Sequence, residues 1–433
     1  MIARLDRMNP EQRKLLFSLG TNFLTRIPGA IGILWFLPLL CFGLGTDEYA
    51  KLLTAMALGS AAAFLFGGFS LVGRRLIGEA YANGDRAGEA AGVVSLFVAN
   101  AVALGLALST IAAYCWVIDS STDFMVVAAL SSFGLFLTTF DNVRSAYNEH
   151  YVTATLQFVL QVTIYAVGFL VPATRHSVIL ASLVVQSHYM LASLITFALL
   201  LRHRPYLMGG RPVVVWPVAR QGTILAMADG LMMATLSLAV VWLQSSASSS
   251  AAAWFATIVR LFQTFLVPVI LLLIPLSSYI RISWNGKSIA QQQAFAKTTL
   301  SIGLGYGAVV AVALLGASQF YVGFLLHLPA PGDFFRILPS FLLFGAIVAY
   351  KSFSSIAYLV LDEPVHLSLW TAAAVGAAVV LGVAASFIVD PLSVINVYSL
   401  VAGLSIIVVL CWNAARFIWP SASQPSALIR DRV

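Results

Sequence analysis

Three charged residues stand within long apolar stretches of the sequence: Arg26, Asp229 and Arg260. A charge is costly inside a bilayer and usually serves a function there. At a helical rise of about 1.5 Å per residue, Arg26 lies about 18 Å and Asp229 about 13 Å beyond the preceding basic residue. The two guanidiniums and one carboxylate leave a net positive charge, and the guanidinium fork suits a phosphate group. We interpret the set as the lining of a water-filled, cationic cavity.

Alternatives stay open for these three charges. A structural Arg–Asp pair, or an arginine hydrogen-bonded across a helix contact, would stabilise the fold without binding a ligand. Asp229 is equally suited to bind a proton or a sodium ion, and so to couple a transport cycle to an ion gradient.

Several amide side chains lie in the same apolar stretches. Gln157 and Gln161 are four residues apart, and Arg260 and Gln263 are three apart, so each pair shares one helix face. Together with Asn22, these amides are suited to bind sugar hydroxyls. The alternative is that they hydrogen-bond across neighbouring helices, as polar residues commonly do in membranes.

Proline and glycine stand next to two of the charges. Pro28 and Gly29 follow Arg26 closely, and Gly230 follows Asp229. A proline removes a backbone hydrogen bond and kinks a helix, and the freed carbonyl groups can line a cavity. We therefore predict that Asp229, Pro28, Gly29 and Gly230 act in coupling or gating. The alternative is that proline is simply commoner in membrane helices than in soluble ones.

The elements that position these residues follow from the composition. Of the 433 residues, 60% are hydrophobic and 9% are charged, with a mean hydropathy of +0.92. Soluble domains carry about a quarter charged residues, so a soluble enzyme, a disordered tail, a disulfide scaffold and a nucleic-acid-binding module are excluded. Continuous apolar runs exclude an outer-membrane barrel. We predict an all-α membrane protein with about twelve transmembrane helices, at 15–43, 49–72, 90–117, 124–143, 151–172, 177–201, 221–243, 250–280, 298–326, 335–358, 367–389 and 394–418.

The basic residues predict the orientation of these spans. Lys and Arg collect on the cytoplasmic side of membrane proteins. With both termini in the cytoplasm, all but five of the 24 Lys and Arg residues lie on that side, and the outer loops are neutral or acidic. The first span is longer than a signal-peptide core and no small-residue cleavage site follows it, so we expect it to be retained.

The sequence also looks duplicated. Gly20-Thr21 at the start of the first span matches Gly222-Thr223 at the start of the seventh. We predict two lobes of six helices each, residues 1–205 and 206–433. Because six is even, the two lobes share one orientation, with a pseudo-two-fold axis along the membrane normal and a central cavity between them.

Motifs for catalysis or cofactor binding are weak. Gly286-Lys287-Ser288 resembles the end of a phosphate-binding loop, but no strand precedes it and Arg281 stands where a glycine is required. The three cysteines lack the spacing of a metal site. We therefore predict that the protein is not an enzyme and has no cofactor or metal.

The whole chain resembles the polysaccharide (Wzx-like) flippases of the multidrug/oligosaccharidyl-lipid/polysaccharide (MOP) exporter superfamily. The resemblance is carried by twelve spans in two parallel halves and by three segments: the basic loop at 73–86, the polar turn at 146–150, and the stretch of the eighth span from Arg260 through Pro268 to Pro275.

The resemblance implies a function. Such proteins flip undecaprenyl-pyrophosphate-linked oligosaccharides across the bacterial inner membrane, by alternating access through a cationic cavity, for O-antigen, capsule or exopolysaccharide synthesis. It implies that Arg26 and Arg260 face this cavity. The implied partners are the lipid-linked glycan, the phospholipid bilayer, a polysaccharide polymerase, a chain-length regulator, and H+ or Na+, with no nucleic acid.

Three other functions are weighed against this one. A cation-coupled multidrug exporter of the same fold would favour an acidic, aromatic cavity, whereas arginine outnumbers aspartate here. An O-antigen polymerase or ligase would need a sizeable outer loop, and the outer loops are short. A major-facilitator transporter shares the twelve spans, but its loop after span 2 would read Gly-x-x-x-Asp-Arg-x-Gly-Arg-Arg, which the segment 84–89 matches poorly.

Overall fold

The computed structural model describes residues 20–21, 32, 34–147, 149–284, 288–328, 330, 334–360 and 364–418. Over these residues the chain is almost entirely helical and contains no strand, which confirms the expected all-α fold class. The helices after the first apolar helix, Leu34–Leu44, are α3 (Thr46–Ala62), α4 (Leu65–Ala82), α5 (Arg86–Val117), α6 (Thr122–Ala146), α7 (His150–Leu170), η1 (Pro172–Arg175), α8 (Val178–His203), η2 (Pro205–Gly209), α9 (Val215–Ser246), α10 (Ser249–Trp284), α11 (Ile289–Ala317), η3 (Ser318–Leu325), α12 (Phe334–Val360), α13 (Pro364–Ala385) and α14 (Pro391–Ile418).

Each of the twelve expected spans contains a helix over its described residues. Leu34–Leu44 belongs to the first span, α3 and α4 together form the second, and α11 with η3 forms the ninth. Among the described residues, six helices are long and apolar enough to cross a bilayer alone, or eight when each bent pair counts as one span. The chain is therefore a multi-pass membrane protein.

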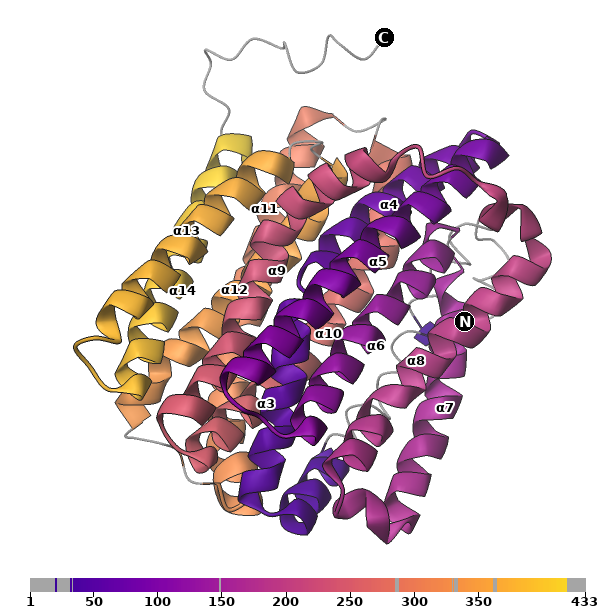
Figure 1. Cartoon of the computed structure of the whole chain (residues 1–433). Coiled ribbons are helices and arrows are strands. Elements are labelled where there is room, and N and C mark those ends of the chain that lie inside the picture. The colour runs from indigo at the N-terminus through magenta and orange to yellow at the C-terminus, as the bar shows by residue number, and fades with distance from the viewer. Residues whose placement is uncertain are drawn as a thin grey trace, which may run out of the picture.

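The helices run side by side as one bundle (Figure 1). Helices α7 and α8 lie at one flank, and α13 and α14 lie at the opposite flank. Between the flanks, α9 packs along both α3 and α4, and α10 packs along α3. The division into lobes 1–205 and 206–433 remains a prediction. Under that division, these four central helices form the main part of the contact between the two lobes.

Two of the central spans are bent at the point where they touch. Helices α3 and α4 meet at 47°, around Ala63 and Phe64, and α9 bends by 57° between Met227 and Gly230. A β-carbon on Gly230 would lie 2.6 Å from the Phe64 carbonyl oxygen, so the two bends are in direct backbone contact. The bend in α9 contains Asp229. The bend at Ala63 and Phe64 contains no proline, and no pattern in the sequence predicts it.

Helix α10 is held in place by a dense apolar core. Residues 251–259 on its first turns are all buried. Trp254 is 1% exposed, and the ring of Phe262 stacks on that of Phe344 in α12 with 4.7 Å between ring centroids. Such contacts fix the rotation of α10 about its own axis, and therefore fix the direction in which Arg260 points.

Candidate functional site

Arg260 interrupts the buried surface of α10. Residues on either side of it are buried, whereas Arg260 is half-buried. Its Nη1 donates a hydrogen bond of 3.2 Å to Oε1 of Gln263. Residues three apart share a helix face, so the helix itself supplies this partner and orients the guanidinium. The structure thus brings together two of the predicted site residues.

Three tyrosines from helices of the first half lie near this guanidinium. They are Tyr49 on α3, Tyr165 on α7 and Tyr189 on α8, and each interacts electrostatically with Arg260. Tyr49 and Tyr165 are buried and Tyr189 is half-buried. Their phenol oxygens carry partial negative charge, which favours the charged form of Arg260. Arg260, in the second half of the chain, therefore has tyrosines of the first half among its electrostatic neighbours.

Polar side chains on α10 and α7 contact two of these tyrosines. The Tyr49 hydroxyl lies 3.1 Å from Oγ1 of Thr257, which precedes Arg260 on α10 by almost one helical turn. The side chain of Gln161, which lies one turn earlier on α7 and is 6% exposed, interacts with the Tyr165 phenol. Gln161 therefore belongs to the surroundings of Arg260, through Tyr165 and not by direct contact.

The third tyrosine is positioned by an amide that joins two helices. Tyr189 donates a hydrogen bond of 3.1 Å to Oε1 of Gln186, whose Nε2 donates to Oγ of Ser131 at 3.0 Å and to Oγ of Ser182 at 2.7 Å. Gln186 therefore ties α8 to α6 and orients Tyr189. His188 packs edge-on against Tyr189, with 5.3 Å between ring centroids.

The remaining predicted site residues are placed less fully. Gln157 is half-buried on α7, one turn before Gln161. Asp229 and Gly230 lie at the bend of α9, where only the backbone of Asp229 is described. Four predicted residues lie outside the described residues: Asn22, Arg26, Pro28 and Gly29.

The three tyrosines are not predicted from the sequence. A tyrosine within a span carries a hydroxyl that needs a partner, and this need is the signal that marks Tyr49, Tyr165 and Tyr189. The chain contains 14 tyrosines, however, and spacing along one helix does not show which residues of other helices will face them. Only the tertiary packing brings these three together around Arg260.

The chemistry of the site is electrostatic. Among the described residues, no group of three or more His, Cys, Asp and Glu side chains is placed to hold a metal ion. The described ionisable neighbours of Arg260 are phenols, which are neutral at physiological pH. The site therefore presents one positive charge, a hydrogen-bonding amide and aromatic faces, which together suit an anionic group linked to a polar or sugar-like body.

Comparison with known proteins gives matches only at the level of structure. No protein-family model and no curated protein sequence matches the chain. The outward-facing conformation of a multidrug resistance MATE family transporter of the MOP superfamily aligns with a TM-score of 0.60 at 13% identity, covering 96% of this chain and 97% of that chain. The inward-facing conformation of such a transporter aligns with a TM-score of 0.56 at 14% identity, covering 91% and 98%.

A third match differs in the reported character of its binding pocket. It is a MOP superfamily transporter from Pyrococcus furiosus, for which a reversed polarity of the binding pocket is said to suggest a different function. It aligns with a TM-score of 0.57 at 14% identity, covering 96% of this chain and 97% of that chain. From these likenesses along almost its whole length, the chain has the fold of the MATE transporters of the MOP superfamily.

Proposed function

We propose that the protein is a transporter that flips an undecaprenyl-pyrophosphate-linked oligosaccharide across the bacterial inner membrane. The observation that carries the proposal is the half-buried Arg260, which pairs with Gln263 and is surrounded by tyrosines rather than by carboxylates among the described residues. A site of this kind attracts an anion and repels a cation.

Moving a pyrophosphate through hydrocarbon requires a large free energy. An isolated charge in an apolar medium is prohibitively unstable. Fixed guanidinium groups replace the water that the pyrophosphate loses, and amides such as Gln157 and Gln161 are suited to sugar hydroxyls. Rocking of two lobes around such a site would expose it to each side of the membrane in turn, while the lipid tail stays in the bilayer.

A cation-coupled multidrug exporter is the second candidate. It is favoured by the structural likeness to multidrug resistance MATE transporters and by the tyrosines, because aromatic faces also bind organic cations. The charge of Arg260 opposes it, since a cationic drug would have to lie near a guanidinium. The two candidates therefore differ in the sign of the charge that the central site accepts.

The test uses purified protein in liposomes that hold a lipid-linked oligosaccharide in one leaflet. Its arrival in the other leaflet is followed by lectin or glycosidase access. Arg260→Ala removes a charged hydrogen-bonding group, for which about 1.5–3 kcal/mol is typical, so we expect flipping to slow by about tenfold or more. Arg260→Lys keeps the charge but not the planar fork, so we expect an intermediate rate.

Arg75→Ala is the matched control. Arg75 is an exposed arginine that pairs with Glu79 at 2.9 Å on the surface of α4, so its loss should leave flipping unchanged. Wild-type flipping by Arg260→Ala would overturn the role of the central arginine. Gradient-driven transport of a cationic dye, with the glycan left in its original leaflet, would instead establish the multidrug exporter.

The orientation of the protein in the membrane fits this function. Both termini and the arginine-rich loops face the cytoplasm, where the lipid-linked glycan is made available. The transported unit would serve O-antigen, capsule or exopolysaccharide synthesis, with a polysaccharide polymerase and a chain-length regulator acting after it. H+ or Na+ would supply the energy if Asp229 couples the cycle.

A further inference from the structure

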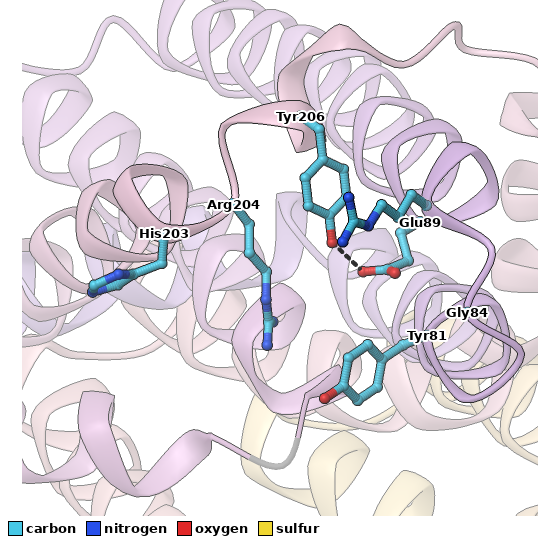
Figure 2. A pocket seen from close by; sticks show the side chains of 7 residues that line it. Tyr81, Gly84, Glu89, His203, Arg204 and Tyr206 are labelled. Atoms are coloured by element: carbon cyan, nitrogen blue, oxygen red, sulfur yellow. Dashed lines mark hydrogen bonds between the residues drawn. The ribbon is translucent and has the colours of Figure 1, made fainter.

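An open pocket of about 360 Å³ lies at one end of the helices of the first half (Figure 2). It stands at the end of α4, the beginning of α5 and the end of α8, on the side that the basic residues assign to the cytoplasm. The pocket is lined by Tyr81, Gly84, Arg86, Glu89, His203, Arg204 and Tyr206. It therefore lies at the level of the membrane surface, away from the central Arg260 site.

A tight turn forms one edge of the pocket. Helix α4 ends at Ala82, and Gly84 adopts a φ of +69°, which a glycine accepts without strain. Asp85 then caps α5 by accepting a hydrogen bond of 2.9 Å from the backbone N–H of Gly88. This turn places Arg86 at the first position of α5, at the pocket edge.

Glu89 is a buried residue of the pocket lining that holds two tyrosines in position. It is 2% exposed, and its Oε2 accepts hydrogen bonds of 2.9 Å from both the Tyr147 and the Tyr206 hydroxyls. Burial, with the hydrogen bond to this carboxylate, raises the pKa of Tyr147, so its phenol stays a donor. Two phenols thus donate hydrogen bonds to the negatively charged Glu89. Through these bonds, the segment after α6, with Tyr147, and the segment after α8, with Tyr206, are joined to α5.

Arg204 brings positive charge to the opposite wall. Its Nη2 donates to Oε1 of Glu149 at 3.1 Å, and its guanidinium lies 3.8 Å from the ring centroid of Tyr147 and 5.3 Å from that of Tyr81. Its Nη1 is buried and has no hydrogen-bond partner among the described residues. Glu149 also pairs with Arg144 at 3.4 Å, so this carboxylate is shared between two arginines.

Arg86 and the charge balance complete the pocket. The Arg86 guanidinium lies 5.7 Å from the ring centroid of Tyr206 and is exposed. Among the residues that line the pocket, two arginines (Arg86 and Arg204) stand against one glutamate (Glu89), and His203 adds a further basic group. The pocket is therefore open, net positive and edged by phenols.

We propose that this pocket binds the phosphate of an anionic phospholipid headgroup, with Arg86 and Arg204 as its charged contacts. Guanidinium forks bind phosphate oxygens, and tyrosines suit the boundary between apolar chains and water. Basic pockets between membrane helices on the cytoplasmic side are known to bind such headgroups. The proposal concerns a site on the first half of the bundle and does not depend on what the protein transports.

The test measures lipid binding to the full-length protein in detergent by native mass spectrometry and by thermal unfolding. The probes are phosphatidylglycerol, phosphatidylcholine and inorganic phosphate. We expect phosphatidylglycerol to bind and to raise the melting temperature more than phosphatidylcholine does. Arg86→Gln should weaken its binding about fivefold, since a basic residue near a membrane surface contributes about 1 kcal/mol to such an interaction.

Two further variants make the result specific. Arg75→Gln removes an exposed arginine of α4 that does not line the pocket, and it should bind phosphatidylglycerol as the wild type does. Arg204→Gln should weaken phosphatidylglycerol binding too, but it also breaks the hydrogen bond to Glu149. If Arg204→Gln does not fold, the result for Arg86→Gln alone decides whether the pocket binds the lipid. Equal weakening by Arg75→Gln and Arg86→Gln would overturn the site. Stabilisation by inorganic phosphate that matches the lipid, and is lost in Arg86→Gln, would overturn the lipid as its source.

Discussion

Gly68 of α4 packs directly onto the backbone of Gly222 of α9, so the two helices touch with no side chain between them. A β-carbon on Gly68 would also lie 2.7 Å from the backbone nitrogen of Ala226 and 2.8 Å from its β-carbon. These distances are shorter than a real β-carbon tolerates. The contact therefore depends on glycine, as close helix contacts in membranes commonly do.

We predict that Gly68→Ala weakens this contact. Gly67→Ala is the matched control, because it lies on the same helix and has no heavy atom within 4 Å of its β-position. Both changes gain the same helix propensity, so their difference isolates packing. Overpacking typically costs about 1–3 kcal/mol, so Gly68→Ala should melt at a lower temperature than Gly67→Ala in detergent. Equal melting temperatures would show that α4 and α9 do not pack this way in solution.

Hydropathy predicts most of this fold. The continuous apolar runs locate the helices because the backbone groups of each span must hydrogen-bond within the helix when they lie in hydrocarbon. The length and polarity of a run are therefore nearly sufficient to predict a helix. They do not predict where a span bends. The break at Ala63 and Phe64 lacks a proline, and it occurs where Gly230 lets the backbone of α9 approach the Phe64 carbonyl. That contact depends on two helices that are far apart in sequence.

The candidate site is predictable only in part, for a related reason. Arg260 and Gln263 are found from sequence because their partnership is local to one helix turn. Tyr49 and Tyr165 come from other helices, and no local pattern links either of them to Arg260. The pocket at Arg86 and its neighbours is likewise assembled from two connections, the α4–α5 turn and the segment after α8, although the basic and polar loops themselves stand out in the sequence.

The first-span arginine provides a second prediction. If Arg26 faces the cavity, as the family resemblance implies, Arg26→Ala should abolish glycan flipping while the protein still inserts into the membrane normally. The reason is the same as for Arg260, since a pyrophosphate needs fixed positive charge to replace its water. Flipping is measured in the liposome assay, and insertion is measured by extraction of the membrane fraction. Flipping at the wild-type rate would mean that Arg26 is a packing residue.

A third prediction concerns the bend of α9. If Asp229 binds the coupling ion, Asp229→Asn should make glycan flipping insensitive to a proton or sodium gradient, because the amide cannot carry the charge that moves with the ion. The flipping rate is measured with and without each gradient. Asp123→Asn is the control, because Asp123 lies in the exposed first turn of α6, outside the apolar core. Unchanged gradient dependence in Asp229→Asn would exclude the coupling role.

A fourth prediction uses a native cysteine to report on contact between the predicted lobes. The Tyr321 hydroxyl, on the π-helix η3, donates a hydrogen bond of 3.1 Å to the Leu34 carbonyl, and Cys41 Sγ lies 4.0 Å from the Leu326 carbonyl. Both contacts join the Leu34–Leu44 helix to the end of the ninth span. Cys41 is buried there with a free thiol, so its alkylation rate measures how often this contact opens.

Removing the Tyr321 hydroxyl should raise that rate. The measurement is alkylation of Cys41 by a small maleimide in a chain that also carries Cys115→Ser and Cys411→Ser. Loss of one hydrogen bond typically costs about 1 kcal/mol, so Tyr321→Phe should speed alkylation about fivefold. Cys115 is buried on α5, and in a Cys41→Ser chain its alkylation should not respond to Tyr321→Phe. A Cys41 rate that ignores Tyr321→Phe would show that this hydrogen bond does not hold the two segments together. A Cys115 rate that rises with it would indicate general loosening of the bundle, because a local opening at Cys41 leaves the buried Cys115 thiol on α5 protected.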